Sequence, residues 1–355
     1  MTREIRVGHV RVGGGAPITI QSMTTLPPSD VDGNVSQIFT LEKAGCDIVR
    51  LAVPDLASAR AIAEIRRQVS IPLVADIHFD YKLALASLDA GVDKIRINPG
   101  NIGGRERVQA VVSACRERSV PIRVGVNGGS LERDILKKHG GATAEALAES
   151  AMGHVRLLEQ EGFYDICISA KSSNVMTTVE AYRLLSKMTE YPLHLGVTEA
   201  GTEFAGTIRS AAGIGALLSE GIGDTIRVSL TAAPEREVEV AKELLRSLGL
   251  KGGGIRLISC PTCGRCRYDM LNLAVQVENR LKELPQDKEL TVAVMGCAVN
   301  GPGEAKIADF GIAGGECEGV LFRRGEIIGK VPQIKLVEAL LDMIKYTDSD
   351  SIEKM

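Results

Sequence analysis

The chain has 355 residues, which is more than one typical domain and suggests two. Its formal net charge is -3, from 42 basic and 45 acidic residues, and aromatic residues make up only 3% with no tryptophan. Neither a nucleic-acid-binding protein nor a membrane-surface protein is indicated by this composition. The N-terminus lacks an apolar signal segment, no apolar stretch reaches the length of a membrane span, and the eight cysteines do not resemble a secreted disulfide framework. We therefore expect a soluble, cytoplasmic protein in a reducing compartment.

Two short alternating pairs, Ile5 with Val7 and Val10 with Val12, predict a β-hairpin at the start of the chain. A unit of one strand and one helix then repeats, and glycines at 45, 91, 162 and 221 mark helix ends. The expected strands are residues 18–23, 46–53, 72–78, 93–98, 121–127, 164–171, 192–198 and 224–231. The expected helices lie near residues 35–44, 57–69, 82–90, 105–118, 143–161, 177–190, 205–220 and 234–248.

Eight evenly sized units in residues 1–250 predict an α/β fold of the (β/α)8 TIM-barrel type. A doubly wound sheet is the alternative, but no GxGxxG opens the first unit. One interval, residues 129–150, is longer than the others.

The pattern changes after a glycine-rich linker at 251–254, so residues 251–355 are expected to form a smaller α+β domain. Its expected order is a strand (255–259), a helix (267–284), a strand (290–296), two strands (305–312 and 319–323) and a helix (332–346). Residues 348–355 form a polar tail.

The barrel strands predict a polar inner face near their C-terminal ends, because alternate residues of a strand point to the same side. The inward polar residues are Arg50, Asp76, His78, Arg96, Asn98, Arg123, Asn127, Cys167, Ser169, Lys171, Arg227, Ser229 and Thr231. Their basic members outnumber the acids. Internal salt bridges would account for some of them. The excess favours a polyanionic ligand such as a diphosphate or a phosphorylated sugar-like molecule. Glu199, after the seventh strand, is a candidate general acid, or else a helix N-cap or surface charge.

A cysteine set dominates the second domain: Cys260-Pro-Thr-Cys263 follows one strand and Cys297 follows the next. Three thiolates that converge at one end of a sheet would bind a zinc ion or an iron–sulfur cluster. No histidine or second CxxC lies nearby, which favours an iron–sulfur cluster with an unusual fourth ligand.

With both halves considered, the chain resembles the IspG (GcpE) family, the 4-hydroxy-3-methylbut-2-en-1-yl diphosphate synthases of the bacterial non-mevalonate isoprenoid pathway. The resemblance spans about residues 5 to 345 and rests on the segments CPTCGR, MGCAVNGPGEA, IQSMTT, ADIHFD, KIRINPGN, VGVNGGSLE, ISAKSSN, GVTEAG and TIRVSL. It implies a TIM barrel followed by a ferredoxin-like, sulfite-reductase-like domain that carries a [4Fe–4S] cluster.

The resemblance also implies a reaction and partners. The family opens 2-C-methyl-D-erythritol 2,4-cyclodiphosphate reductively, with loss of water, to give the linear allylic diphosphate. Electrons come singly from reduced flavodoxin or ferredoxin, and homodimers place the cluster domain of one chain over the barrel of the other.

By the same resemblance, site residues are assigned. The cluster ligands are Cys260, Cys263, Cys297 and Glu304, the glutamate being a weak ligand that substrate oxygen replaces. Glu199 is the proton donor. The diphosphate is held by Arg50, Arg96, Arg123, Asn127, Lys171, Arg227 and Ser229, with Asp76, His78 and Asn98 nearby.

Three alternatives stay open at this stage. Cys266 completes a CxxCxxC pattern and competes with Glu304 as fourth ligand. A zinc-stabilised binding domain on a phosphate-binding barrel would do no redox chemistry. A phosphosugar lyase or aldolase would use Lys171 as a Schiff base but leaves the cysteines unexplained.

Overall fold

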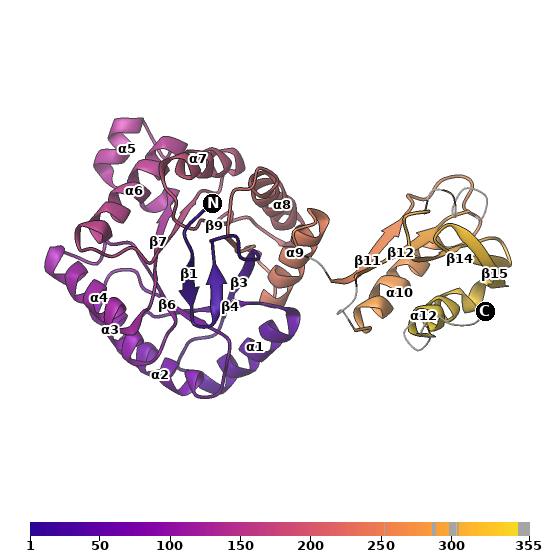
Figure 1. Cartoon of the computed structure of the whole chain (residues 1–355), viewed down its shortest axis with the longest axis horizontal. Helices are drawn as coiled ribbons and strands as arrows, with labels where there is room; N and C mark the ends of the chain where they lie inside the picture. The colour runs from indigo at the N-terminus through magenta and orange to yellow at the C-terminus, as the bar shows by residue number, and fades with distance from the viewer. Residues whose placement is uncertain (252, 286–288, 298–302, 304, 347–355) are drawn as a thin grey trace. The chain divides into compact units, whose positions relative to one another are not determined.

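The computed structural model describes residues 1–251, 253–285, 289–297, 303 and 305–346. The chain divides into two compact units, Met1–Lys251 and Gly252–Met355 (Figure 1). Each unit has its own sheet and its own apolar core.

Eight parallel strands form the barrel of the first unit, in the order β8-β7-β6-β5-β4-β3-β10-β9. A parallel bridge between Ile168 and Leu193 joins the two ends of this sheet, so the barrel closes. The (β/α)8 prediction is confirmed and the doubly wound alternative is not formed. The strands are β3 (Thr19–Met23), β4 (Ile48–Ala52), β5 (Leu73–Asp76), β6 (Lys94–Ile97), β7 (Ile122–Asn127), β8 (Ile166–Lys171), β9 (His194–Leu195) and β10 (Thr225–Ile226).

A ring of helices surrounds the barrel (Figure 1). Their bounds are α1 (Val31–Ala44), α2 (Leu56–Arg66), α3 (Tyr81–Asp89), α4 (Arg105–Arg118), α5 (Arg133–His139), α6 (Ala144–Gln160), α7 (Val175–Met188), α8 (Glu203–Ser219) and α9 (Pro234–Ser247). The four glycines expected at helix ends all have positive φ, from 68° at Gly162 to 97° at Gly45, where a residue with Cβ would be strained. The long interval after β7 contains the 3-10 turn η1 (Gly128–Ser130) and the additional helix α5. In the described part of the chain, no helix is both long and apolar enough to cross a membrane.

Strands β9 and β10 are much shorter than the expected 192–198 and 224–231. Pairing continues to Arg227, whose N–H donates to the carbonyl of Leu195 at 2.9 Å. Beyond it, the amide of Leu230 donates to the Glu237 carboxylate at 3.0 Å, and pairing resumes as an isolated parallel bridge between Thr202 and Thr231. The alternation of the sequence does not reveal this hydrogen bond, because the acceptor lies on a helix.

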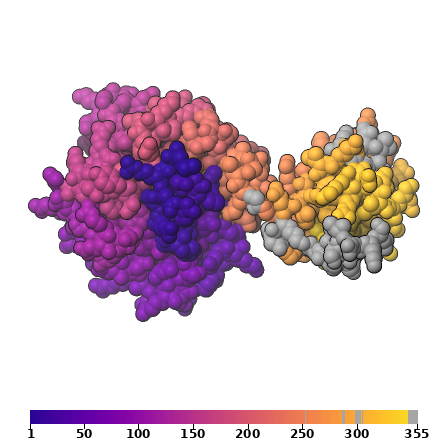
Figure 2. Space-filling view, viewed as in Figure 1, coloured from indigo at the N-terminus to yellow at the C-terminus, as the bar shows by residue number. Residues whose placement is uncertain are grey.

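The predicted N-terminal hairpin is also confirmed. Strands β1 (Ile5–Val7) and β2 (Val10–Val12) pair antiparallel, and Ile5, Val7 and Val12 are buried in one cluster with Ile48, Val74 and Cys167. Ile48 and Val74 belong to the first residues of β4 and β5, so the hairpin covers the N-terminal end of the barrel. Figure 2 shows the N-terminal segment, in indigo, lying across this face.

The second unit contains a five-stranded mixed sheet in the order β11-β12-β13-β14-β15. Its elements are β11 (Gly254–Ser259), α10 (Met270–Lys282), β12 (Glu289–Met295), β13 (Phe310–Ala313), β14 (Glu318–Arg323), β15 (Glu326–Pro332), the 3-10 turn η2 (Gln333–Lys335) and α12 (Leu336–Tyr346). The helices α10 and α12 pack on one face, through Val277, Leu281, Leu340 and Ile344. Ala305 and Ala308 pack with Met295 and Phe322 in a separate cluster. The expected small α+β domain is therefore present.

Its details differ from the sequence-based expectation in four ways. Strand β15 was not expected, residues 305–309 form a turn rather than the start of a strand, and the last helix begins at 336 after a 3-10 turn. The strands β11 and β12 pair directly and in parallel, whereas the expected ferredoxin-like topology splits its βαβ unit. The turn between β14 and β15 explains the missed strand. Arg324 and Gly325 have φ of 49° and 83°, as a two-residue type I′ turn requires, but Arg-Gly is not a usual sequence signal for it.

Truncating a buried side chain of the β1–β2 hairpin should destabilise the barrel. Val7→Ala removes two methyl groups from a fully buried side chain, so we expect the barrel to lose about 2 kcal/mol of unfolding free energy. The matched control is Val10→Ala, on the same hairpin but only partly buried, which should lose clearly less. Urea unfolding followed by far-UV circular dichroism measures both, and equal losses would mean that the hairpin does not seal the barrel.

Candidate active site

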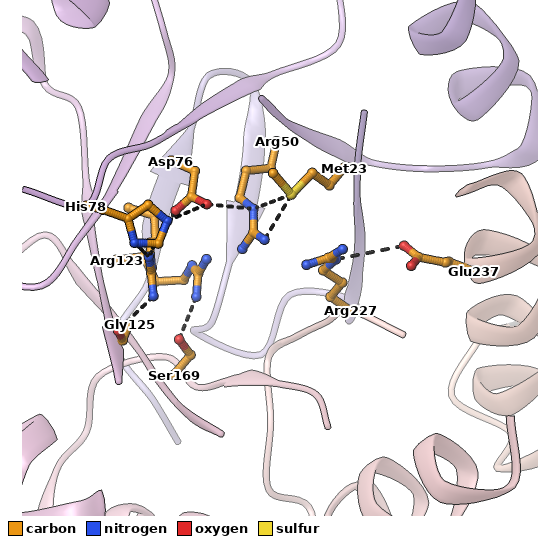
Figure 3. A network of polar contacts seen from close by, with 10 residues as sticks. Met23, Arg50, Asp76, His78, Arg123, Gly125, Ser169, Arg227 and Glu237 are labelled. Carbon is orange, nitrogen blue, oxygen red and sulfur yellow. Dashed lines mark hydrogen bonds and ion pairs between the residues drawn. The ribbon is translucent and has the colours of Figure 1, made fainter. Parts of the chain in front are cut away.

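Polar side chains fill the interior of the barrel toward the C-terminal ends of its strands, an end that we call the mouth. Asp76, Arg96 and Arg123 are register partners on β5, β6 and β7, so they lie next to one another on the inner face. Arg50 on β4, Lys171 on β8 and Arg227, directly after β10, come from other parts of the wall. Figure 3 shows Arg50, Asp76, Arg123 and Arg227 from close by.

Asp76 is the hub of this cluster. Its carboxylate lies 3.1 Å from Nη1 of Arg96, 3.8 Å from Nε of Arg50 and 3.4 Å from Nε2 of His78. Burial alone would raise the pKa of Asp76. The positive charges of Arg50 and Arg96 and the hydrogen bond with His78 outweigh burial and hold this pKa well below its usual range. Asp76 is therefore an anion that bridges two guanidinium groups.

The other contacts of the arginines are with weaker or more distant partners. Arg123 donates to the hydroxyl of Ser169, and Arg50 donates from Nε and Nη2 to the sulfur of Met23 at 3.1 and 3.0 Å. Nε of Arg227 is 3.8 Å from the carboxylate of Glu237, which also accepts from the hydroxyl of Ser22 at 3.0 Å. Two carboxylates thus face four guanidinium groups and Lys171.

This excess leaves hydrogen-bond donors without acceptors. Nε and Nη2 of Arg123 and Nε of Arg96 are buried and have no hydrogen-bond partner among the described residues. Burial, and then the charge of Arg96, lowers the pKa of Arg123 to about 10. Buried donors that lack acceptors are costly unless a ligand or water satisfies them. The arrangement suits a ligand with several anionic oxygens.

Two glycines give the cations room. A Cβ built on Gly125, at an inward position of β7, would lie 2.3 Å from Nε of Arg96. A Cβ on Gly196, directly after β9, would lie 2.4 Å from Nζ of Lys171. Any other residue at either position would displace a cation. Arg96 also uses the gap at Gly125 to donate to its carbonyl oxygen at 3.0 Å.

Lys171 is buried in this positive environment and has no ion-pair partner among the described residues. Burial lowers its pKa well below the ordinary value, and the charges of Arg123 and Arg227 lower it further. The negative charge of an incoming anion would oppose both effects, so ligand binding would favour the protonated amine.

The other residues expected at the site lie nearer to solvent or lack partners. The His78 side chain is 57% exposed. Asn98 is buried with Oδ1 unsatisfied among the described atoms. Asn127 and Ser229 are half-buried. Glu199 is exposed with a φ of 54°, and the cap of α8 is Thr202, so Glu199 is not a helix N-cap. A left-handed non-glycine residue is a strained position of the kind found at functional sites.

Several interior residues escaped the sequence analysis. Lys94, Gln21 and His194 are buried and carry polar atoms without partners among the described residues. The signal for Lys94 was present, because Lys94 and Arg96 on β6 and Asn98 directly after it occupy every second position and so share one face. Glu237 was missed because it reaches the barrel from α9, where only its position on the buried face of the helix distinguishes it.

In the second unit, Cys260 and Cys297 follow the adjacent parallel strands β11 and β12. The sulfur of Cys260 accepts a hydrogen bond from the N–H of Gly296 at 3.2 Å. Cys263 is exposed, while Cys260, Cys266 and Cys297 are half-buried. The hydroxyl of Tyr268 donates to the carbonyl of Met295 at 2.6 Å and ties the cysteine loop to the end of β12.

Glu304 lies outside the described residues, so its place relative to the cysteines is not part of the structure. Among the residues that are described, no three His, Cys, Asp or Glu side chains are already gathered as a metal site. The thiol of Cys266 donates to the carbonyl of Tyr268 at 3.3 Å, and that of Cys260 donates to the sulfur of Met270 at 3.7 Å.

The residues present nevertheless fit an iron–sulfur group. The three thiols of Cys260, Cys263 and Cys297 occur in the loops that follow the C-terminal ends of β11 and β12, and none is in a disulfide. The N–H of Gly296 already points at a sulfur, as amides around protein-bound clusters do. Gly296 also has no room for a side chain without crowding, since a Cβ there would lie 3.1 Å from Met270 and 3.3 Å from the Cys260 sulfur.

Comparison with known proteins gives matches over nearly the whole chain. Residues 2–242 match the model of the GcpE TIM-barrel domain, and residues 256–346 match that of the GcpE protein C-terminal domain. The flavodoxin-type 4-hydroxy-3-methylbut-2-en-1-yl diphosphate synthase of Geobacter sulfurreducens is 58% identical over 340 residues, covering 96% of each chain. The synthase of the same name from Clostridium perfringens is 58% identical over 344 residues, covering 97% of this chain and 98% of its own.

Among solved structures, a Xanthomonas albilineans dihydropteroate synthase aligns with 69% of this chain and 97% of its own, at 13% identity and a TM-score of 0.49. That similarity is too low to carry information about function. The sequence matches cover both units and the whole cation-lined barrel, and on them the chain belongs to the GcpE family of 4-hydroxy-3-methylbut-2-en-1-yl diphosphate synthases.

Proposed function

We propose that the barrel mouth binds the cyclic diphosphate substrate of this family and that the second unit carries the redox centre. The function is that of the family: an oxidoreductase that opens 2-C-methyl-D-erythritol 2,4-cyclodiphosphate to 4-hydroxy-3-methylbut-2-enyl diphosphate in isoprenoid biosynthesis. The observation that carries the assignment of the barrel is its excess of buried and half-buried cations near the mouth, four arginines and Lys171 facing two carboxylates among the described residues.

The diphosphate would be held by Arg50, Arg96, Arg123, Lys171 and Arg227, assisted by Asn127 and Ser229. Arg96 and Arg50 are preset by Asp76, so their side chains need little reordering when the anion arrives. Asp76, His78 and Asn98 line the same end of the barrel and would fix the orientation of the sugar-derived part.

Glu199 is the proposed proton donor for the oxygen that leaves as water. Glu199 is exposed in the segment that follows β9 at the mouth. Gly196, which makes room for Lys171, lies three residues earlier in the same segment. A carboxylic acid positioned at a leaving oxygen is a standard general acid.

Cys260, Cys263 and Cys297, with Glu304, are the proposed ligands of a [4Fe–4S] cluster. Such a cluster supplies single electrons at low potential and an iron with a replaceable ligand. Thiolate ligands need a reducing compartment, so a cytoplasmic location is part of the proposal. Because the relatives are named for flavodoxin, we infer that flavodoxin is the electron donor here, with ferredoxin as the alternative.

A homodimer in which two chains share each active site completes the proposal. It is supported by large apolar side chains exposed in the loops and first helical turns that follow the barrel strands. Phe79 is 73% exposed, Phe204 79% and Met176 57%. Exposed apolar groups around a polar site are typical of surfaces covered by another chain.

The first test concerns the anion site. Lys171→Met should weaken the binding of inorganic pyrophosphate by about thirtyfold or more, because loss of one buried charge contact costs ~2–5 kcal/mol. Lys187→Met, an exposed lysine on α7, is the control and should bind as the unaltered protein does. Isothermal titration calorimetry measures both. Equal affinities would remove Lys171 from the site, and a covalent Lys171 adduct trapped by borohydride would revive the lyase alternative.

The second test separates proton transfer from binding. Glu199→Gln should lower kcat with reduced flavodoxin by about 10²–10⁴-fold, the usual contribution of a general acid. Its affinity for pyrophosphate should not change. The control Glu203→Gln alters a carboxylate at the start of the next helix that is paired with Arg236, and it should keep normal turnover. Normal turnover of Glu199→Gln would mean that another group donates the proton.

The third test concerns the cysteines. Cys297→Ser, purified without oxygen, should lose the brown absorption and most of its iron, since a serine oxygen replaces a thiolate ligand poorly. Cys317→Ser, an exposed cysteine outside the proposed set, should keep both. If Cys266→Ser loses iron as completely as Cys297→Ser, Cys266 rather than Glu304 is the fourth ligand. Bound zinc in place of iron would remove the redox assignment.

A further inference from the structure

Lys94 is the most deeply placed cation of the barrel. It is the first residue of β6 and precedes Arg96 by two positions, so both point inward and Lys94 lies nearer the N-terminal end. Its side chain is completely buried, and Nζ has no hydrogen-bond partner among the described residues. The proposed substrate contacts do not include it.

Among the described residues, no carboxylate pairs with Lys94, and Cys167 would favour its charged form only as a thiolate. Cys167 on β8, Arg123 on β7 and Arg50 on β4 act on it electrostatically, and His194 on β9 feels its charge. Burial raises the pKa of the Cys167 thiol and lowers that of His194 well below its usual value, so both stay neutral. Above it, Asp76 on β5 is already bound by Arg50 and Arg96. Glu237 contacts Ser22, Leu230 and Arg227.

A buried amine without an acceptor destabilises a folded protein, and an apolar side chain of similar length would fit the same space better. A purely structural role therefore does not explain Lys94. What it does supply is positive charge two positions before Arg96 on β6, where it acts electrostatically on Arg50 and Arg123.

We propose that Lys94 is a positioning residue of the diphosphate site, which repels the guanidinium groups of Arg50 and Arg123 toward the mouth and strengthens the field on the anion without touching it. This inference rests on the proposed function of the barrel. It adds a second layer of charge below the layer that contacts the ligand.

The proposal has a consequence for protons. Burial lowers the pKa of Lys94 from 10.5 to about 8; Arg123 and Arg50 lower it too, whereas Cys167 opposes them. Lys94 therefore loses its proton as pH rises through that value in the empty protein. A bound anion favours the charged amine and raises the pKa, so binding above this pH takes up a proton. Affinity for the anion must fall as pH rises through about 8.

The test uses the full-length protein and inorganic pyrophosphate, titrated calorimetrically between about pH 7 and pH 9. Lys94→Met should raise the melting temperature, because it removes an unpaired buried charge, yet weaken pyrophosphate binding about tenfold at the lower pH. Pyrophosphate and Lys171 also titrate, so the relevant quantity is the difference between the two proteins. That difference should shrink at the upper end of the pH range.

Lys242→Met is the matched control, because Lys242 is a partly buried lysine on α9 whose Nζ donates to the carbonyl of Ala44 at 3.0 Å, away from the mouth. It should leave pyrophosphate affinity and its pH dependence unchanged. If Lys94→Met does not fold, Lys94→Gln tests the same claim: in titrations in two buffers of different ionisation enthalpy, it should take up fewer protons on binding than the unaltered protein does.

The outcomes are distinguishable. A Lys94→Met protein that binds pyrophosphate normally at every pH overturns the inference, whatever its melting temperature. A lower melting temperature with unchanged binding assigns Lys94 a structural role. Absence of proton uptake by the unaltered protein above about pH 8 also overturns it. Failure of the unaltered protein to bind pyrophosphate at all would instead remove the proposed anion site.

Discussion

The ion pairs of Asp76 with Arg50 and Arg96 are the interaction on which the barrel interior depends. Without this carboxylate, the strand walls would bring Arg50, Arg96, Arg123, Lys171 and Arg227 together in a volume from which water is largely excluded. Like charges at such distances repel strongly at low dielectric. Asp76 offsets part of that repulsion, and a net positive charge remains in the interior. The lowered pKa of Asp76 has the same cause, because the neighbouring guanidinium groups stabilise its charged form.

The apolar side of the barrel wall compensates for this costly interior. Residues that alternate with the cations, such as Leu51, Ala75, Ile97 and Val124, are completely buried in the large core shared with the helices. Their burial contributes in proportion to apolar area, whereas the destabilising charges are few. The hairpin β1–β2 adds a second apolar seal at the opposite end, so the polar groups face only one opening. The repulsion between the cations is therefore greatest near the mouth, where an anionic ligand would reduce it.

The two units divide the chemistry between them. The barrel has the cations and glycines that accept a polyanion, and the described part of the second unit has thiols in loops held by Tyr268 and Gly296. Neither set alone accounts for a reductive ring opening, which needs both a fixed diphosphate and a source of single electrons. Membership of the GcpE family links them, since the matched models cover both units.

The sequence by itself determined the barrel, because eight strand–helix units with capping glycines leave few other folds. It also determined many of the residues that face inward, because side chains alternate along a strand. The CxxC pattern and the family resemblance supplied the cysteines and the reaction. Only the tertiary structure decided that Asp76 pairs with Arg50 and Arg96, that Gly125 and Gly196 make room for cations, and that the buried amine of Lys94 has no partner among the described residues. Alternation gives the face of a strand, but contacts across a barrel depend on the stagger of strands and the reach of long side chains. Those are set by packing of the whole domain, not by any local stretch of sequence.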